Sequence, residues 1–236
     1  MNRVEHIRQE EKRYHDSCYD RYSLFEPGSW LHKPVKTVLE QMEHFAAYTH
    51  LNVLDLGSGI GRNSIPIAQG LQGRSGRVVC VDLLPSAINK LIDYSRQYGV
   101  QSRIDAQLSD IEHYVIEPAA YDYIIAVSTL EHLSSEQALV SKLQEMAAGT
   151  NRSGVNCIII GSNIREVTVE TKVELDPMFE INLPTDRMLQ LLDTQYAGWD
   201  VQMRLVKPLT YEIDRDGASV LLTTDCITYV AKKPAN

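Results

Sequence analysis

The sequence has little of what marks disulfide-rich, secreted or membrane proteins. Its four cysteines form no CxxC pair, and three of them lie in apolar runs typical of strands, so we expect reduced core thiols. No run of about 18 apolar residues occurs, and the charged N-terminus lacks the apolar stretch of a signal peptide. We therefore expect a cytoplasmic protein with no membrane partner.

Dense basic runs and metal-ligand motifs are missing as well. Lys and Arg number 23 against 31 Asp and Glu, a formal charge of −8 that disfavours a nucleic-acid partner. The seven histidines show no ligand spacing with Cys or Asp, so no metal site is expected. What the chain does have is 236 residues of 44% hydrophobic content, enough for one domain with a buried core.

Short apolar runs alternate with helix-length segments from residue 51 onward, which predicts crossover units and a parallel sheet. Helix-end signals support this pattern: Pro85 and Gly99 bracket one helix, and Ser134 with Gln137 predicts a capping box for the next. Further helices are expected over 34–46 and 185–193. The predicted strands are 51–56, 78–82, 103–107, 121–127, 155–160, 200–206 and 220–232, with a hairpin turn at 214–217.

Two segments allow more than one interpretation. Residues 14–32 are rich in aromatics and show no helical period. They suit an N-terminal arm, residues 1–33, that either covers a pocket of the domain at 34–236 or merely packs on its surface. Residues 162–184 alternate charged residues with valines, as an extra strand or hairpin would. That element would form an acceptor wall, the edge of a homodimer, or a surface strand with no role.

The strongest chemical signal is the run VLDLGSGIGRN at 53–63, a strand that leads through a glycine turn into a helix start. Glycines let a ligand approach the main chain, and a helix N-terminus points free N–H groups at it, although a tight turn alone would also need them. Asp82 ends the second strand, where a carboxylate can bind ribose hydroxyls or cap the next helix. Asp110, after the third strand, suits an adenine edge or a loop cap.

The glycine spacing separates two cofactor classes. A dinucleotide site has the pattern G-x-G-x-x-G, whereas this chain has G-x-G-x-G with Asp55 two residues before the first glycine. That carboxylate would repel a pyrophosphate but would suit a ligand end that bears an ammonium group. An NAD-dependent oxidoreductase is therefore the less favoured interpretation.

With these motifs, the chain from about residue 34 onward resembles the class I S-adenosylmethionine-dependent methyltransferases. The matching runs are DLGSGIG at 55–61, VDLLPSAI at 81–88, SD at 109–110 and YDYIIAVSTLEHL at 121–133. More weakly, GRNS at 61–64 and TYVAKKP at 228–234 are similar to the tellurite-resistance type. The resemblance implies an α/β fold: a Rossmann-like three-layer αβα sandwich around a seven-stranded, mostly parallel sheet of order 3-2-1-4-5-7-6, with the last strand antiparallel.

The resemblance also implies the roles of individual residues. The glycine loop would wrap the methionine end of S-adenosylmethionine, with Asp55 near its ammonium, directly or through water. Asp82 would hold the ribose, Leu83 would pack on the adenine, and Ser128 would lie beside the sulfonium. The full set of expected cofactor contacts is Asp55, Gly57, Ser58, Gly59, Gly61, Arg62, Asn63, Asp82, Leu83, Asp110, Ile111 and Ser128.

Methyl transfer from a sulfonium is an in-line displacement, so the protein mainly positions the reactants and excludes water. A general base is needed only when the acceptor must lose a proton. His132, after the fourth strand, is the candidate base or acceptor-positioning group, and a packing or capping role is its alternative. The arm offers candidates for the acceptor pocket: Tyr14, Tyr19, Tyr22, Trp30 and His32.

These residues predict a methyltransferase that acts on a small-molecule acceptor. Tellurite is disfavoured because the turn region at 211–216 is more acidic than basic. A non-catalytic module that binds S-adenosylmethionine is the main alternative. The acceptor, the atom methylated and the oligomeric state are not determined by the sequence.

Overall fold

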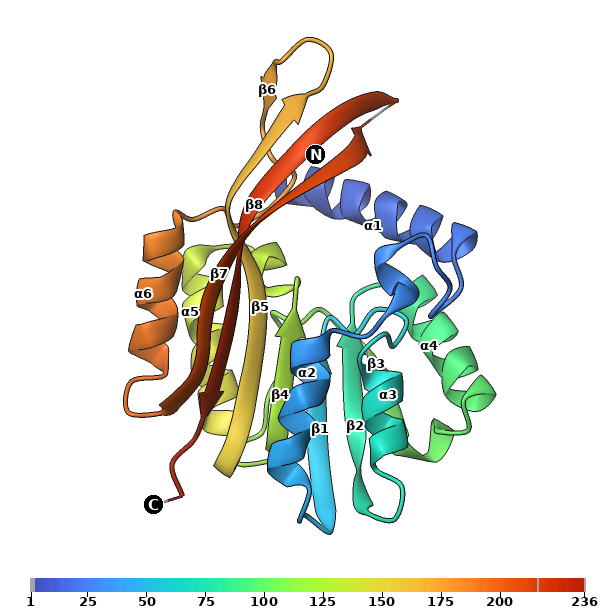
Figure 1. Cartoon of the computed structure of the whole chain (residues 1–236), viewed down its shortest axis with the longest axis vertical. Coiled ribbons are helices and arrows are strands. Elements are labelled where there is room, and N and C mark those ends of the chain that lie inside the picture. Colours follow the sequence, from blue (N-terminus) through green and yellow to red (C-terminus); the bar gives the residue numbers. More distant parts are fainter. Residues whose placement is uncertain (1–2, 216, 236) are drawn as a thin grey trace.

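A mixed sheet of eight strands runs through the computed structural model, which describes residues 3–215 and 217–235 (Figure 1). The strands are β1 (His50–Leu56), β2 (Ser75–Asp82), β3 (Ile104–Leu108), β4 (Tyr121–Val127), β5 (Thr150–Thr168), β6 (Glu174–Leu175), β7 (Asp200–Arg215) and β8 (Ala218–Lys232). Their order is β3-β2-β1-β4-β5-β8-β7, and the two-residue β6 pairs only with β5. Apart from β6, this is the predicted order.

The strand directions confirm the predicted topology as well. Strands β1 to β5 pair in parallel, whereas β8 is antiparallel to both of its neighbours, β5 and β7. Because parallel strands end at the same edge, the loops after β1, β2, β3 and β4 meet at the carboxyl end of the sheet. In open α/β sheets this edge is where ligands bind.

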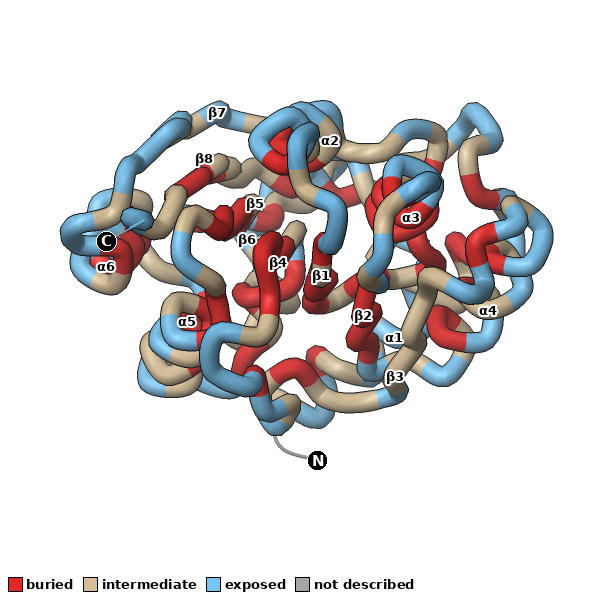
Figure 2. Tube along the Cα trace, turned by 90° about the horizontal axis from the view of Figure 1, so that it is seen from below, coloured by how far each residue is buried: buried red, intermediate tan, exposed pale blue. Residues whose placement is uncertain are grey.

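Helices cover both faces of the sheet because successive strand residues point to opposite sides. Val53 belongs to the core under α2 (Lys36–Glu40), η2 (Gln41–Phe45), α3 (Ser64–Gly70) and α4 (Pro85–Gln97). Leu54 belongs to the core under α5 (Glu136–Gly149) and α6 (Thr185–Gln195). Figure 2 shows the buried strands between these two layers. The short turns η3 (Gln101–Arg103) and η4 (Leu130–His132) precede β3 and follow β4.

Strands β5, β7 and β8 continue far beyond the other strands as a twisted extension (Figure 1). The pairing of β5 with β8 reaches Thr168 and Val220, and β7 with β8 closes at Arg215 and Ala218. The predicted turn at 214–217 is present, with the Gly217 N–H donating to Asp214, although residue 216 lies outside the described residues. The outer half of β5 and β6 form the hairpin that one interpretation of 162–184 predicted.

The N-terminal arm differs from the prediction. Helix α1 (Arg3–Arg21) occupies residues expected in part to be aperiodic, and only the short turn η1 (Trp30–His32) follows it within the arm. In α1 the buried residues are Ile7, Cys18 and Tyr19. Because polar contacts hold most of the helix, it lacks the apolar stripe by which sequence reasoning recognises helices. In Figure 1, α1 lies across the carboxyl end of the sheet.

The cap of α5 is also one residue away from the prediction. Its N-cap is Ser135, whose hydroxyl accepts a hydrogen bond from the N–H of Ala138. Ser134 instead donates its hydroxyl proton to the carboxylate of Glu112, at 2.7 Å, and so joins the loops after β3 and β4. Adjacent serines give the same local signal, and this long-range contact decides between them.

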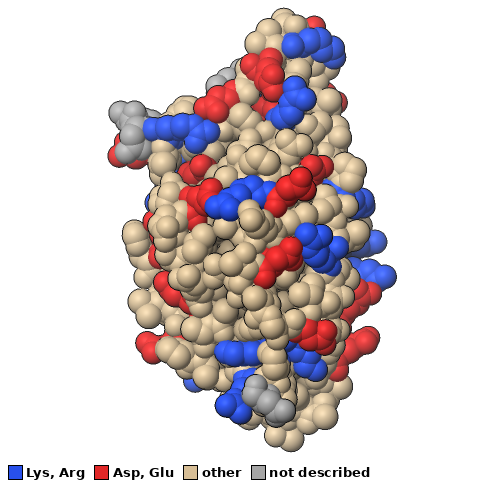
Figure 3. Space-filling model, turned by 90° about the vertical axis from the view of Figure 1, so that its left-hand side faces the viewer, with Lys and Arg blue, Asp and Glu red and all other residues tan. Residues whose placement is uncertain are grey.

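Charges of both signs are interspersed on the side shown in Figure 3. Helix α6 carries two of the ion pairs, Arg187 with Glu136 of α5 and Asp193 with Arg204 of β7. Across residues 3–215 and 217–235, no helix has both the length and the apolar character that crossing a bilayer requires.

Candidate functional site

The glycine loop after β1 is clamped between two neighbouring strand ends. The N–H groups of Gly57 and Ser58 both donate to the carbonyl of Val81 in β2, at 2.8 and 3.1 Å. Gly57 has a φ of +69°, and a Cβ there would lie 2.2 Å from the Thr129 hydroxyl oxygen after β4. A larger residue would therefore pay both backbone strain and a clash, so the position requires glycine.

Asp82 ties this loop to the start of α4. Its two carboxylate oxygens accept hydrogen bonds from the N–H groups of Gly59, at 2.8 Å, and Leu84, at 2.9 Å. Burial raises the pKa of Asp82, while these backbone N–H groups oppose the rise. Tyr19 of α1 lies directly over the loop, only 4% exposed, with its hydroxyl 3.1 Å from where a Cβ on Gly59 would be. The arm thus covers the loop.

Two of the residues predicted to bind the cofactor form hydrogen bonds with other residues of the protein. Asp55 is buried beneath the loop and accepts a 2.5 Å hydrogen bond from the Ser64 hydroxyl. Burial raises the pKa of Asp55 to about 7, although that hydrogen bond and the charge of Arg62 act in the opposite direction. Asn63 accepts a hydrogen bond from the N–H of Val35, at 3.0 Å, and so positions the start of α2.

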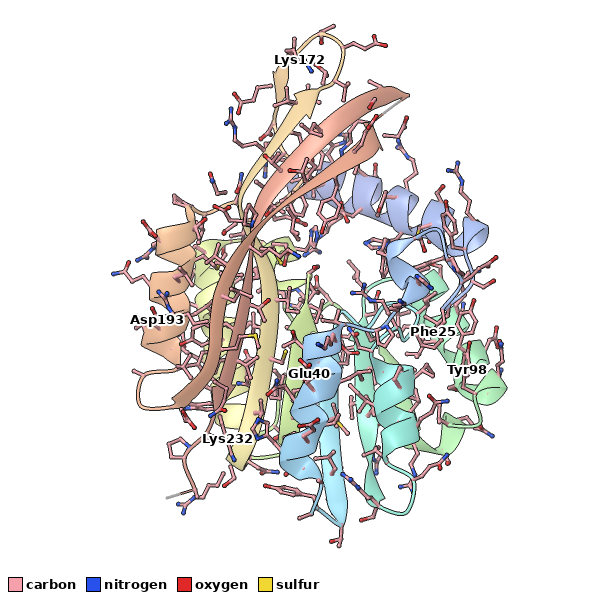
Figure 4. The ribbon with its side chains drawn as sticks, viewed as in Figure 1. Phe25, Glu40, Tyr98, Lys172, Asp193 and Lys232 are labelled. Atoms are coloured by element: carbon pink, nitrogen blue, oxygen red, sulfur yellow. The ribbon has the colours of Figure 1, made fainter. Side chains whose placement is uncertain are left out.

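Arg62 connects the glycine loop to η1 of the arm. Its guanidinium donates to the carbonyl of Trp30 at 2.9 Å and lies 5.0 Å from the centre of the same indole ring. Burial lowers the pKa of Arg62. A hydrogen bond and a cation–π contact to one residue hold this part of the arm against the loop. At the other end of the arm segment, Phe25 meets Tyr98 after α4, with ring centres 5.6 Å apart (Figure 4).

Three of the five predicted acceptor residues gather around His15, which sequence reasoning missed. The His15 ring centre lies 5.4 Å from Tyr14, 5.6 Å from Tyr19 and 5.7 Å from Trp30. We call these four residues the aromatic cluster. The remaining two predicted residues lie elsewhere on the arm, Tyr22 against Gly28 and His32 in η1.

The predicted adenine side of the site lies after β2 and β3. Leu83 is 44% exposed at the edge of the sheet, whereas Ile111 is buried. Asp110 accepts a hydrogen bond from the N–H of Glu112, at 2.9 Å, and its other oxygen pairs with Arg8 of α1 at 2.9 Å. The structure therefore brings these residues to one edge of the sheet and adds a contact from the arm.

Ser128, directly after β4, has an unusual backbone. Its φ is +50°, a left-handed conformation that costs free energy for a non-glycine residue. Its N–H donates to the carbonyl of Ile159 in β5 at 2.8 Å, which holds the strained residue at the strand end. Ser128 is exposed, so a ligand at the sheet edge can reach it.

His132 lies between two carboxylates. One ring nitrogen lies 2.9 Å from Glu180, the other 3.8 Å from Glu11 of α1, and the ring stacks on Phe179. Burial disfavours the imidazolium, but the hydrogen bond to Glu180 and the charges of Glu11 and Glu131 outweigh it and raise the pKa to about 9. A protonated ring would pair with both carboxylates and so hold α1, as in the packing alternative, and the role of His132 as a base stays a prediction.

The sequence does not show which carboxylates lie beside His132. Glu11 and Glu180 lie 121 and 48 positions away along the chain, so no local signal joins them to His132. Glu131 is adjacent and lies within the motif at 121–133. Its side chain is buried, and one oxygen accepts a hydrogen bond from the N–H of Gly161 at 3.2 Å.

A cavity of about 380 Å³ lies near His132 and its acidic partners, between α1 and the β5–β6 hairpin. Met178, next to the Phe179 that stacks on His132, lines it. Arg215 also lines it and is held by a bidentate pair with the buried Glu166, at 3.0 and 2.7 Å.

The methyltransferase-domain family model matches residues 53–154, which span the glycine loop, Asp82, Asp110 and His132. Two similar solved structures are the YcgJ protein from Bacillus subtilis (12% identity, 85% of this chain and 99% of that one, TM-score 0.58) and an S-adenosylmethionine-dependent methyltransferase from Methanosarcina mazei (12%, 86% and 100%, 0.57). A third is the cyclase SpnF (14%, 89% and 85%, 0.57). No curated protein matches the sequence.

Residues 53–154 are therefore a methyltransferase domain, and the fold is shared with S-adenosylmethionine-dependent methyltransferases. Within this domain, the glycine loop has a position that suits S-adenosylmethionine. Ser58 is 6% exposed, and its hydroxyl has no hydrogen-bond partner among the described residues. A buried hydroxyl without a partner is costly, so a polar group of the cofactor would satisfy it. The narrower similarity to the tellurite-resistance type stays a prediction.

Proposed function

We propose that this methyltransferase acts on a small-molecule acceptor that binds between α1 and the end of β4. The main observation in support is that α1 lies over the glycine loop and the segment after β4, with Tyr19 against Gly59 and Glu11 beside His132. A helix in that position would exclude bulk water from the methyl transfer. Residues 1–33 then act as a lid on the domain formed by residues 34–236.

The methyl donor supplies a methyl group on a sulfonium, and the chain's residues position it. In the proposed site, Gly57, Ser58 and Gly59 bind the methionine end, with Gly61 shaping the turn. Asp82 binds the ribose in addition to capping the turn before α4, which its two backbone hydrogen bonds allow because each carboxylate oxygen accepts more than one. Leu83 covers the adenine, Asp110 and Ile111 border it, and the exposed Ser128 faces the sulfonium.

We also propose that the protein is cytoplasmic, has no nucleic-acid partner and is able to form a homodimer. A net charge of −8 and the mixed charges in Figure 3 support a chain without a nucleic-acid partner. All four cysteines are free thiols, which suits the reducing cytoplasm. Strand β7 lies at the edge of the sheet with Leu205 and Tyr211 exposed, so it is the edge through which a homodimer would form. Sedimentation of the purified protein tests that assembly.

Calorimetric titration with S-adenosylmethionine and, separately, with NAD tests the cofactor site. We expect the wild-type protein to bind S-adenosylmethionine alone, and Asp82→Ala to weaken it at least about 10-fold because a ribose partner is lost. Asp93→Ala is the matched control, since Asp93 is an exposed carboxylate on α4 that pairs with Arg96. Asp82→Asn keeps one acceptor oxygen and separates loss of binding from loss of folding.

Binding of NAD, or equal binding of S-adenosylmethionine by wild type and Asp82→Ala, would overturn the proposed site. The reaction needs its own assay, because the fold is shared with a structure described as a cyclase. Transfer of a labelled methyl group to members of a small-molecule library supports the enzyme. Cofactor binding without transfer to any member favours the non-catalytic module.

A further inference from the structure

Glu131 is a buried carboxyl group with an unfilled bonding position. It is only 3% exposed, and while Oε1 accepts from the N–H of Gly161, Oε2 has no hydrogen-bond partner among the described residues. Burial raises the pKa of Glu131. A buried carboxyl oxygen without a donor destabilises the fold, so a chemical reason for keeping it is expected.

The position of Glu131 places it at the proposed site of methyl transfer. It lies in η4, three residues after the exposed Ser128 that directly follows β4. Across from it, Gly161 of β5 pairs with Cys226 of β8, and a Cβ on Gly161 would lie 3.5 Å from Glu131 Oε1. The carboxyl group therefore lies between the end of β4 and the start of the strand extension, where an acceptor has to come close to the sulfonium.

The nearby cations are already paired with other carboxylates. His132 is bonded to Glu180 and lies near Glu11, and Arg8 pairs with Asp110 at 2.9 Å. Arg215 is held by Glu166. None of the ion pairs among the described residues includes Glu131, so its oxygen would gain most from a ligand that brings both N–H donors and positive charge.

We propose that Oε2 of Glu131 binds the ammonium group of an amine acceptor and takes one of its protons. This inference rests on the proposed function. Proton transfer to Glu131 frees the nitrogen lone pair, which forms a bond to the methyl carbon as the carbon–sulfur bond breaks and its electrons go to sulfur. The products are a methylated ammonium, a neutral thioether and a protonated Glu131 that returns its proton to solvent.

The surroundings also indicate the rest of the acceptor. His15 of the aromatic cluster lies 3.4 Å from Glu11, one turn away on α1, and Glu11 in turn is near His132. An aromatic acceptor body would suit the aromatic cluster, so an arylalkylamine is the first acceptor class to test. The probes are therefore 2-phenylethylamine, with histamine and ethanolamine as smaller or more polar amines, and the uncharged 2-phenylethanol as their isostere.

Calorimetry in the presence of saturating S-adenosylhomocysteine tests the amine site. We expect at least one amine probe to bind the wild-type protein, and Glu131→Gln, which keeps an oxygen for the Gly161 N–H, to weaken it at least about 10-fold. Binding of 2-phenylethanol should be weaker and the same in both proteins. Glu117→Gln, a change of an exposed carboxylate, is the matched control. Labelled-methyl transfer to the amine should fall at least about 100-fold in Glu131→Gln.

Equal binding of amines by wild type and Glu131→Gln, preference for 2-phenylethanol, or no binding of any amine probe would overturn the amine site. Glu131→Asp retains the charge on a shorter side chain, so part of the amine preference should return there, which a purely structural role would not produce. Titration with S-adenosylmethionine keeps the two proposals apart. A protein that binds the cofactor but no amine rejects only the role of Glu131, whereas one that binds no cofactor rejects the proposed function.

Discussion

The pairing of His132 with carboxylates predicts that the protein loses stability as the pH rises above neutral. Burial alone would lower the pKa of this ring, but Glu180, Glu11 and Glu131 raise it from 6.5 to about 9. A group whose pKa is higher in the folded protein stabilises it in the protonated form. The contribution is therefore fully present below about pH 6.5 and disappears as the pH rises through about 9.

The size of the effect follows from the two pKa values. Their difference corresponds to about 3 kcal/mol of stability, which is an upper limit. The His132 side chain is 25% exposed, so solvent screens part of the interaction. We expect the stabilisation by His132 to fall by about 1–2 kcal/mol between about pH 6 and pH 10.

Urea unfolding of the wild type and His132→Gln at both pH values measures this change. His132→Gln leaves the buried Glu180 without its cation at any pH, so only the pH-dependent part of the difference is used. His113→Gln, at an exposed position, controls for the loss of a histidine. The wild type should be more stable than His132→Gln at low pH, and the gap should narrow as the pH rises. If the difference in stability between the wild type and His132→Gln stays constant or widens as the pH rises, the raised pKa of His132 is refuted.

Two substitutions near the loop give further tests by urea unfolding. Gly57→Ala and Gly73→Ala both place a Cβ on a left-handed residue, but only at Gly57 does it meet Thr129, at 2.2 Å, so we expect Gly57→Ala to cost at least about 2 kcal/mol more. Equal losses would contradict the clash. Asp55→Asn should gain stability relative to wild type, by about 2–4 kcal/mol, as the pH rises from about 4 to 7, because burial raises the Asp55 pKa to about 7 and ionisation then opposes folding. A relative stability that falls over this range would contradict it.

The central strands and the glycine loop could be predicted from the sequence because their signals are local. An apolar run of strand length predicted β4 at its observed bounds, Tyr121–Val127, and Pro85 and Gly99 marked the ends of α4. The spacing of Gly57, Gly59 and Gly61 identified the loop, and all three adopt positive φ. Such features depend on residues a few positions apart, so the chain itself carries them.

The length of the strand extension could not be predicted in the same way. Strand β5 runs to Thr168 rather than 160, and β7 to Arg215 rather than 206. Most outer residues of β7 are exposed, so they lack the alternation of buried and exposed positions. Their strand conformation depends on hydrogen bonds to β8, a partner that sequence periodicity does not show.

By itself, then, the sequence predicted the strands and the glycine loop with Asp82 at its edge, and its resemblance to known methyltransferases added the sheet order and the methyltransferase domain. Only the tertiary structure decided that α1 is a helix, that Asn63 holds Val35, and that His132 lies between Glu180 and Glu11. Backbone conformation follows from neighbours along the chain, whereas the charge state of a side chain follows from whatever the fold brings within a few ångströms.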